Sequence, residues 1–219
     1  MAVDKALAVR DLSKRYGDVT ALRNVSFEVE RGEQILVFGH IGSGKSTLFK
    51  CIVGLARCVG EISVYGVREV KRIKKLVGYS PQETVLEPGW RVASVVRYFA
   101  ELKDVEVDVE KFLGGLGLAD KARARVDELS GGMRRLLTVA LAFLGDPPVM
   151  LFDEPLNDLD IEARRAFLET LSELRREDKT VLVASHDYSP FLARVDRVLV
   201  LNRGEIKDIV PPNNFLKYV

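Results

Sequence analysis

G-H-I-G-S-G-K-S-T, residues 39–47, is the stretch that decides the fold of this chain. It follows the apolar run I-L-V-F at 35–38 and precedes L-F-K at 48–50, the order of strand, glycine loop and helix that a phosphate cradle requires. The glycines let backbone N–H groups converge on phosphate oxygens, and the helix that begins after them adds its positive end. We expect Lys45 to neutralise the β- and γ-phosphates and the Ser46 hydroxyl to hold Mg²⁺. The sequence therefore predicts a nucleoside triphosphate site.

The composition narrows the class of protein. The 219 residues suit one large domain with ample length to bury a core. Lysine and arginine total 33 against 32 acidic residues, so no overall positive field favours nucleic acid as a partner. The longest nearly apolar stretch, 136–144, is far shorter than the roughly 20 residues that span a bilayer. No apolar segment of a signal peptide follows Met1–Lys5, so we expect a cytoplasmic chain.

The two cysteines, Cys51 and Cys58, lie seven positions apart and have no second Cys/His pair. That spacing matches neither a zinc ligand set nor a redox C-x-x-C motif. We therefore expect both to be reduced packing residues.

Alternating and continuous apolar runs predict the sheets. Residues 7–9 and 25–29 alternate in the manner of strands and predict a small antiparallel layer that leads into the buried strand at 35–38. Three more apolar runs without alternation predict parallel strands covered on both faces. They occupy 149–152, 181–184 and 198–201.

Helical patterns separate these strands. Residues 161–176 place an apolar side chain every three or four positions, with acids and arginines between them. The alternating order predicts an α/β fold, a three-layer P-loop NTPase core with an N-terminal antiparallel β layer. From about Thr84 to Glu128 the pattern is helical, at 92–102 and 109–113, with no convincing strand.

We therefore expect a single domain over residues 1–219 with a helical lobe inserted into it. The β layer and core would occupy about 1–83 and 145–219, and the lobe about 84–144.

The segment V-M-L-F-D-E-P at 149–155 has the form of a Walker B motif, a buried strand that ends in two adjacent carboxylates. Strand alternation points these side chains in different directions, so they can have different roles. We expect Asp153 in the outer shell of Mg²⁺ and Glu154 beside a water aligned with the γ-phosphate. The ordinary alternative is an acidic pair at the start of a solvated loop.

The segment L-S-G-G-M at 129–133 opens a second helix of interest. Ser130 is a good N-cap, and Gly131 and Gly132 leave the first N–H groups accessible to an anion. One chain therefore carries two helix starts suited to phosphate.

With these motifs the sequence resembles the nucleotide-binding subunit of ATP-binding-cassette (ABC) transporters, from about Leu7 to Gly204. The resemblance implies ATP and Mg²⁺ as cofactors, hydrolysis of ATP, and head-to-tail pairing with a second such subunit, identical or different. In that pairing the signature at 129–133 of one subunit closes over the ATP of the other. It also implies integral membrane permease subunits as partners, and a place on the inner face of the cell membrane.

Four further positions match the family one at a time. Tyr16 resembles the aromatic residue that stacks on adenine, and Gln82 resembles the Q-loop glutamine that contacts Mg²⁺ or the attacking water. Asp160 resembles the D-loop aspartate at the dimer interface, and His186 resembles the switch histidine at the γ-phosphate. Each also has an ordinary interpretation, as a strand-end tyrosine, a solvated glutamine, a helix N-cap and a packing histidine.

The expected site therefore has three groups of residues. The catalytic group is Lys45, Gln82, Glu154 and His186. The metal group is Ser46, Gln82 and Asp153. The nucleotide-binding group is Tyr16, Gly39, His40, Ile41, Gly42, Ser43, Gly44, Lys45, Ser46, Thr47, Ser130, Gly131, Gly132 and Asp160.

Some positions depart from the common family pattern. His40 and Ile41 replace the frequent Pro-Asn, so only their backbone is expected to matter, and Met133 replaces the signature glutamine. The string S-G-G-M-R-R at 130–135 resembles the exporter-like ABC-2 branch and favours export over import.

Two other functions compete with a transporter subunit. A soluble ABC ATPase of DNA repair or translation usually has a coiled-coil insertion or two cassettes in one chain, and this sequence shows neither. A small-molecule P-loop kinase leaves the Ser130 motif and His186 unexplained.

Overall fold

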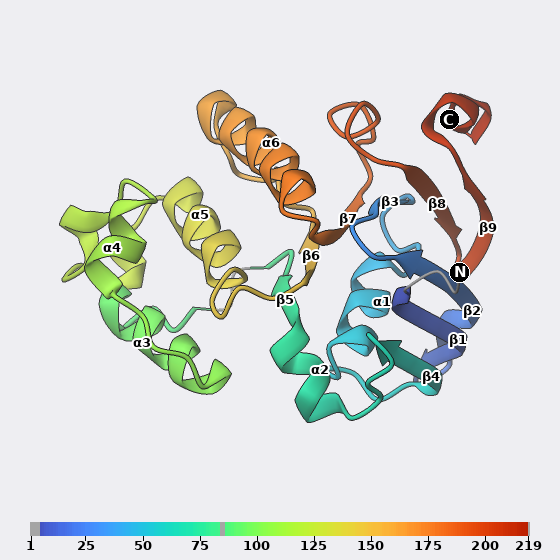
Figure 1. The fold of residues 1–219 in the computed structure, drawn as a ribbon, viewed down its shortest axis with the longest axis horizontal. Helices are drawn as coiled ribbons and strands as arrows, with labels where there is room; N and C mark the ends of the chain where they lie inside the picture. The colour runs from blue at the N-terminus through green and yellow to red at the C-terminus, as the bar shows by residue number, and fades with distance from the viewer. Residues whose placement is uncertain (1–4, 84–85, 219) are drawn as a thin grey trace.

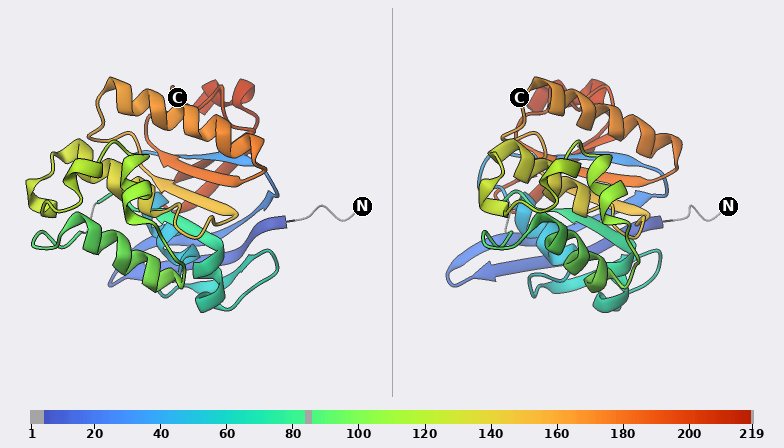
Figure 2. Two further views of the ribbon diagram at one scale, coloured as in Figure 1. Left: turned by 60° about the vertical axis from the view of Figure 1, so that its left-hand side comes forward. Right: turned by 90° about the vertical axis from the view of Figure 1, so that its left-hand side faces the viewer.

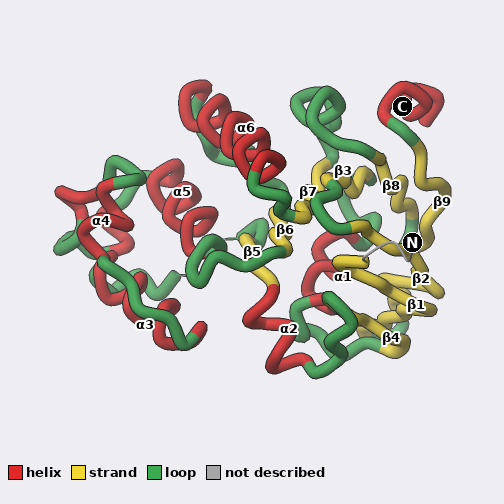
Figure 3. The backbone as a smooth tube through the Cα atoms, viewed as in Figure 1, coloured by secondary structure: helices red, strands yellow, loops and turns green. Residues whose placement is uncertain are grey.

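The computed structural model describes residues 5–83 and 86–218. Residues 1–4 and the expected start of the lobe at Thr84 lie outside the described residues. Figure 1 shows two sheets on one side of the molecule and a group of helices on the other. Figure 3 separates them by type, with strands on one side and most of the helical lobe on the other.

The smaller sheet is antiparallel and has the order β2–β1–β4. Its strands are β1 (Lys5–Tyr16), β2 (Val19–Glu30) and β4 (Val59–Val64). Figure 2 shows the long strands β1 and β2 extending along one side of the molecule. The predicted antiparallel layer is therefore confirmed, with longer strands than the alternation alone indicated.

The larger sheet has six strands in the order β5–β6–β7–β3–β8–β9. All neighbours are parallel except β8 and β9, which form an antiparallel pair at one edge. The strands are β3 (Gln34–Phe38), β5 (Val77–Ser80), β6 (Val149–Asp153), β7 (Thr180–Ser185), β8 (Arg197–Asn202) and β9 (Glu205–Val210).

Both faces of this sheet are buried. Along β3, Ile35 and Val37 face the antiparallel sheet and α1 (Lys45–Ile52), whereas Leu36 and Phe38 face α6 (Ile161–Arg176). This burial on two faces explains why the strand sequences are continuously apolar. The predicted three-layer α/β core with α6 at 161–176 is confirmed.

The helical lobe has its own apolar cluster, built from Val92, Val96, Leu113, Leu137 and Leu141 among others. Its helices are α3 (Val92–Lys103), α4 (Val109–Gly114) and α5 (Gly131–Leu141), joined by the 3₁₀ turns η1 (Ala119–Lys121) and η2 (Val126–Glu128). Within residues 86–128 the only extended pairing is a single bridge between Arg91 and Arg125, in agreement with the predicted lack of strands.

Several elements were not foreseen. They are β4, β5, β9 and the C-terminal 3₁₀ segment η3 (Pro212–Tyr218), whereas the short basic helix α2 (Val70–Leu76) agrees with the helical interpretation of the run K-R-I-K-K at 71–75. Strand β5 has the sequence V-G-Y-S, and Gly78 weakens its apolar signal. A Cβ at Gly78 would lie 2.2 Å from the carbonyl oxygen of Ala142, so close packing explains the glycine.

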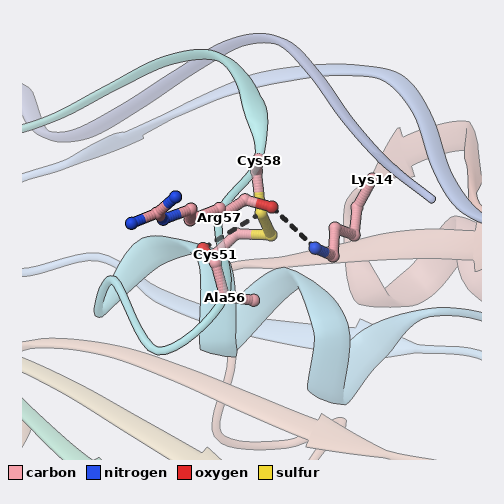
Figure 4. The surroundings of a disulfide bond; sticks show 5 residues. All are labelled: Lys14, Cys51, Ala56, Arg57 and Cys58. Atoms are coloured by element: carbon pink, nitrogen blue, oxygen red, sulfur yellow. Dashed lines mark hydrogen bonds between the residues drawn. A yellow bond between two sulfur atoms is a disulfide. The ribbon is translucent and has the colours of Figure 1, made fainter. Parts of the chain in front are cut away.

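The expectation of two reduced cysteines is wrong, because a disulfide joins Cys51 and Cys58 (Figure 4). The turn after α1 brings Cys58, directly before β4, back to the end of that helix, and the two Cα atoms are 6.0 Å apart. In the same turn Lys14 Nζ donates to the Arg57 carbonyl at 2.8 Å. Spacing rules for metal and C-x-x-C sites do not detect such a short structural loop.

In the part of the chain that the structure describes, no helix combines the length and hydropathy needed to cross a bilayer.

Candidate nucleotide site

The pairing of the parallel strands brings the predicted motifs together at the carboxyl ends of the strands of the larger sheet. Phe38 pairs with Ser185, Asp153 pairs with Ala184, and Phe152 pairs with Ser80. Because these parallel strands all end on the same side, the loops that follow them meet there. Those loops carry residues 39–47, Gln82, Glu154 and His186, so segments far apart in the sequence form one site.

The glycine loop takes a conformation that only glycine adopts easily. Gly42 and Gly44 have φ values of 80° and 109°, in the left-handed region. A Cβ at Gly44 would lie 2.6 Å from the carbonyl oxygen of Ala21 on β2, so a side chain there would displace the loop. The helix α1 begins directly after it, at Lys45.

A cavity of about 300 Å³ opens over this loop. It contains most of the predicted loop residues together with Gln82, Glu154 and His186. Its lining residues are Val19, Thr20, Ala21, Ile41, Gly42, Ser43, Gly44, Lys45, Ser46, Thr47, Gln82, Glu154, Asn157 and His186.

The Lys45 ammonium lies inside the loop, with only 6% of the side chain exposed. Its Nζ donates to the carbonyl oxygens of Gly39 at 2.6 Å and His40 at 3.3 Å. It also lies 3.5 Å from Glu154 Oε1. The positive charge is therefore already placed where the loop N–H groups converge.

Glu154 is the most constrained residue of the site. Its φ of 46° is in the left-handed region, which is uncommon for a residue with a side chain. Its backbone N–H donates to the Ala184 carbonyl at 2.8 Å. Its carboxylate accepts from the Ser185 hydroxyl at 3.2 Å and from the His186 backbone N–H at 3.0 Å, and His186 Nδ1 lies 3.0 Å from Oε2.

Asp153 is fully buried, and neither of its carboxylate oxygens has a hydrogen-bond partner among the described residues. Burial raises the pKa of this carboxyl group; the nearby Ser46 hydroxyl and the Lys45 and Arg135 charges oppose this rise, and the Glu154 charge adds to it. Nearby, the Ser46 hydroxyl donates to Gln82 Oε1 at 3.4 Å. Unpartnered carboxylate oxygens beside hydroxyl and amide oxygens fit Mg²⁺, which prefers oxygen ligands and takes only one or two carboxylates in nucleotide sites.

Seven expected nucleotide contacts do not line this cavity: Tyr16, Gly39, His40, Ser130, Gly131, Gly132 and Asp160. Tyr16 ends β1 and is 48% exposed, with Lys14 Nζ 4.6 Å from its ring centroid. Ser130 caps α5 by accepting from Met133 N–H at 3.2 Å, and Asp160 caps α6 by accepting from Ala163 N–H at 2.8 Å. Both N-cap predictions are confirmed.

Some residues that line or support the site carry no motif by which sequence reasoning could select them. Val19, Thr20 and Ala21 reach the site because β2 passes over the glycine loop. Asn157 follows the Walker B strand and lines the cavity, and its place three residues before Asp160 in L-N-D-L-D at 156–160 was the available signal. Arg135 was quoted only as part of the signature string, yet it is almost fully buried beneath the site.

Comparison with known proteins identifies related chains. The family described as "ABC transporter" matches residues 22–157. A "Nod factor export ATP-binding protein I" of Rhizobium etli is 36% identical over 91% of this chain and 66% of its own length. A "Sulfate/thiosulfate import ATP-binding protein CysA" of Mycolicibacterium paratuberculosis is 34% identical over 95% of this chain and 60% of its own length. This chain therefore spans less than two thirds of both relatives.

Among solved structures, a dimeric bacterial ABC transporter cassette superposes with a TM-score of 0.84 at 25% identity. The match covers 94% of this chain and 98% of that one.

Proposed function

This chain belongs to the ABC transporter family, whose ATP-binding subunits hydrolyse ATP, and we propose that it powers export across a membrane. The observation that carries the proposal is the position of Glu154. Its carboxylate is 3.5 Å from Lys45 Nζ and 3.0 Å from His186 Nδ1, at the edge of the loop cavity. A base placed between a phosphate-binding lysine and a histidine suits attack of water on a γ-phosphate.

In this proposal each side chain has one role. Glu154 orients the water and accepts its proton, and the Lys45 ammonium neutralises the β- and γ-phosphate oxygens. His186 donates a hydrogen bond to the transferred group. Ser46, Gln82 and Asp153 would hold Mg²⁺, which neutralises phosphate charge when bound. The remaining contacts come from the backbone of residues 39–47, and from Tyr16 stacked on the adenine.

The position of the signature motif supports pairing of two subunits. Ser130 and the two glycines open α5 outside the cavity of their own chain. A Cβ at Gly132 would lie 3.3 Å from the Asp158 carbonyl, so the signature adjoins the loop that leads to Asp160. Head-to-tail pairing would bring this helix start, and Asp160, to the ATP of the other copy. The dimeric cassette with the same fold is consistent with this arrangement.

A groove between core and lobe offers a docking place for a membrane permease subunit. It has a volume of about 430 Å³ and is lined by apolar side chains, including Leu86, Phe99 and Leu102. Three lysines also line it and no acidic residue among those described: Lys50, Lys74 and Lys103.

The Lys103 ammonium in this groove is buried without a hydrogen-bond partner among the described residues, and burial lowers its pKa to about 8. The apolar part of a permease segment would pack against the apolar lining of the groove, and a carboxylate on that segment would pair with its lysines. This contact would hold the subunit at the inner face of the cell membrane.

Export rather than import rests on the signature string at 130–135 and on the export relative, whose identity of 36% slightly exceeds the 34% of the import relative. The transported compound is not specified by any residue of the site described above.

The test compares the wild type with Glu154→Gln in Mg-ATP, by light scattering and phosphate release. We expect the variant to bind ATP, accumulate as a dimer and lose turnover by about 100-fold or more. Glu173→Gln, on the exposed face of α6, is the matched control and should behave as the wild type. If Glu154→Gln hydrolyses ATP at the full rate, the assignment of Glu154 is wrong.

If the wild type stays monomeric while it hydrolyses ATP, the two-subunit site is wrong. A rate that depends on an added phosphate acceptor would instead favour a kinase.

A further inference from the structure

One charged side chain of α5 is directed into the interior of the protein. Arg135 is only 2% exposed and heads the fully buried side chains ranked by volume. It lies five residues after Ser130, on the helix that the signature motif opens. A guanidinium in such a place must satisfy its N–H groups within the protein, because unpaired buried donors are strongly unfavourable.

The guanidinium donates to five backbone carbonyl groups. Nη1 donates to Pro81 and, at 3.3 Å, to Gln82. Nη2 donates to Asp153 at 2.8 Å and to Glu154 at 2.9 Å. Nε donates to Pro155 at 3.4 Å. A guanidinium has five N–H donors, so every donor of Arg135 has its own acceptor.

These acceptors belong to two separate loops. Pro81 and Gln82 follow β5, whereas Asp153, Glu154 and Pro155 form the end of β6 and the turn after it. Arg135 therefore joins three segments of the chain: the signature helix, the Gln82 loop and the Glu154 turn.

The Glu154 turn is the segment that most needs such support. Its left-handed backbone is unfavourable for a residue with a side chain and persists only where surrounding contacts fix it. The Ala184 carbonyl fixes its N–H group, and Arg135 fixes its carbonyl group. Both backbone polar groups of the residue that carries the carboxylate are thus held by hydrogen bonds.

The charge of Arg135 also suits this place. Burial lowers the pKa of the guanidinium, while Asp153, Asp158 and Glu154 act in the opposite direction. An arginine keeps its proton under such conditions, so the group acts as a permanent donor.

We propose that Arg135 is a positioning residue for ATP hydrolysis. It holds the backbones of Gln82 and Glu154 in fixed positions relative to each other and to the signature helix. The inference rests on the proposed role of Glu154 as the residue that orients water. A lysine has three donors on one nitrogen and does not reproduce the planar arrangement of the guanidinium donors. Arg135→Lys therefore keeps the charge but loses the contacts that fix the two loops relative to each other.

The first experiment needs no hydrolysis. Hydrogen–deuterium exchange of the nucleotide-free protein compares Arg135→Lys with the wild type in peptides that cover 78–83 and 153–158. We expect faster exchange in both, because both loops lose a common support. Unchanged exchange in either segment would overturn the proposal, whatever the ATPase rates show.

The second experiment is a double-mutant cycle with Glu154→Gln. We expect Arg135→Lys to lower kcat by about tenfold or more and to leave the ATP dissociation constant within about threefold, because a small misplacement of a catalytic group mainly affects the rate. In the Glu154→Gln background the same change should alter the residual rate less than about twofold. Independent, multiplicative losses would show that Arg135 does not act through Glu154 and would refute the proposal.

Arg197→Lys is the matched control for a loss of stability alone. Arg197 is partly buried, donates to the Glu28 carbonyl at 2.9 Å and to the Glu33 carboxylate at 2.7 Å, and lies at the opposite ends of the strands. It should lower the thermal midpoint without lowering kcat. If Glu154→Gln is itself fully active, the proposed function fails, while the exchange experiment still decides whether Arg135 supports both loops.

Discussion

His186 and Glu154 are joined by two contacts. The His186 backbone N–H donates to Glu154 Oε1 at 3.0 Å, and His186 Nδ1 lies 3.0 Å from Oε2. Since the first contact uses only the backbone, the Glu154 carboxylate keeps its hydrogen bonds from the His186 N–H and the Ser185 hydroxyl when the histidine ring is removed. The His186 side chain is 47% exposed and the Glu154 side chain 6%, so the ring is the part of this pair that can reach a phosphate.

His186→Ala therefore separates the two roles. We expect kcat to fall by about 100-fold, within the usual range for loss of one proton-transferring or hydrogen-bonding group, with ATP affinity changed only a few-fold. Phosphate release and a fluorescent nucleotide titration measure the two quantities. A variant with normal kcat would show that the ring does not take part in hydrolysis.

Asp153→Asn should lose function and gain stability. The Asp153 carboxylate is buried without a partner among the described residues, so a neutral amide of the same shape lowers the cost of burial. We expect Mg²⁺-dependent hydrolysis to fall by about 100-fold or more. In EDTA at pH 7 the thermal midpoint should rise by about 2–4 °C.

The stability gained by Asp153→Asn also depends on pH. Burial raises the folded pKa of Asp153 above its ordinary value of about 4, so the wild type loses stability as pH rises from there through the raised value. The difference between variant and wild type should be absent below about pH 4 and grow above it. A variant that is less stable than the wild type at pH 7 contradicts this account.

Gly204→Ala should disturb the glycine loop, although Gly204 is distant from that loop in the sequence. Gly204 N–H donates to the Ser43 carbonyl at 2.9 Å, and a Cβ at Gly204 would lie 2.7 Å from the Ala21 carbonyl oxygen. Gly66 has a similar left-handed φ of 73° but nothing within 4 Å of its Cβ position. Gly66→Ala thus carries the backbone strain alone and is the matched control.

We expect Gly204→Ala to be about 1–3 kcal/mol less stable than Gly66→Ala in chemical denaturation, and to bind ATP more weakly. Equal stability and equal affinity of the two variants would show that the contact with Ala21 does not constrain the loop.

The disulfide should be a measurable source of stability. Joining Cys51 to Cys58 closes a short loop, for which the loss of unfolded-state entropy corresponds to about 2–3 kcal/mol. Reduction should therefore lower the thermal midpoint by roughly 4–12 °C. The Cys51→Ser/Cys58→Ser variant should show the lower midpoint with and without reductant. A wild type that is insensitive to a strong reductant would contradict this contribution.

The sequence predicted best where one local pattern determines the outcome. The glycine loop, the apolar strands and α6 each carry their own signal, and each lies where it was expected. Strand β5 and the edge strand β9 were not predicted, because β5 contains Gly78 and β9 mixes charged with apolar residues. Their pairing depends on neighbours that are distant in the chain.

The supporting contacts of the site were beyond sequence reasoning for a related reason. Arg135 resembles a surface arginine in a helix with mixed composition, and only the fold reveals five carbonyl groups around it. The disulfide likewise depends on a turn that returns β4 to the end of α1. Motifs pointed to the residues proposed as direct participants, whereas they gave no sign of the residues that hold them in position.

The placement of Ser130 outside its own loop cavity gives the proposed pair of identical copies a genetic property. A copy defective at Ser130 still offers an intact Glu154, and a copy defective at Glu154 still offers an intact signature. Neither variant alone would assemble a complete site, yet a mixed pair would contain one complete site and one doubly defective site. Two inactive proteins should therefore complement each other on mixing, and activity should peak at equal amounts of the two.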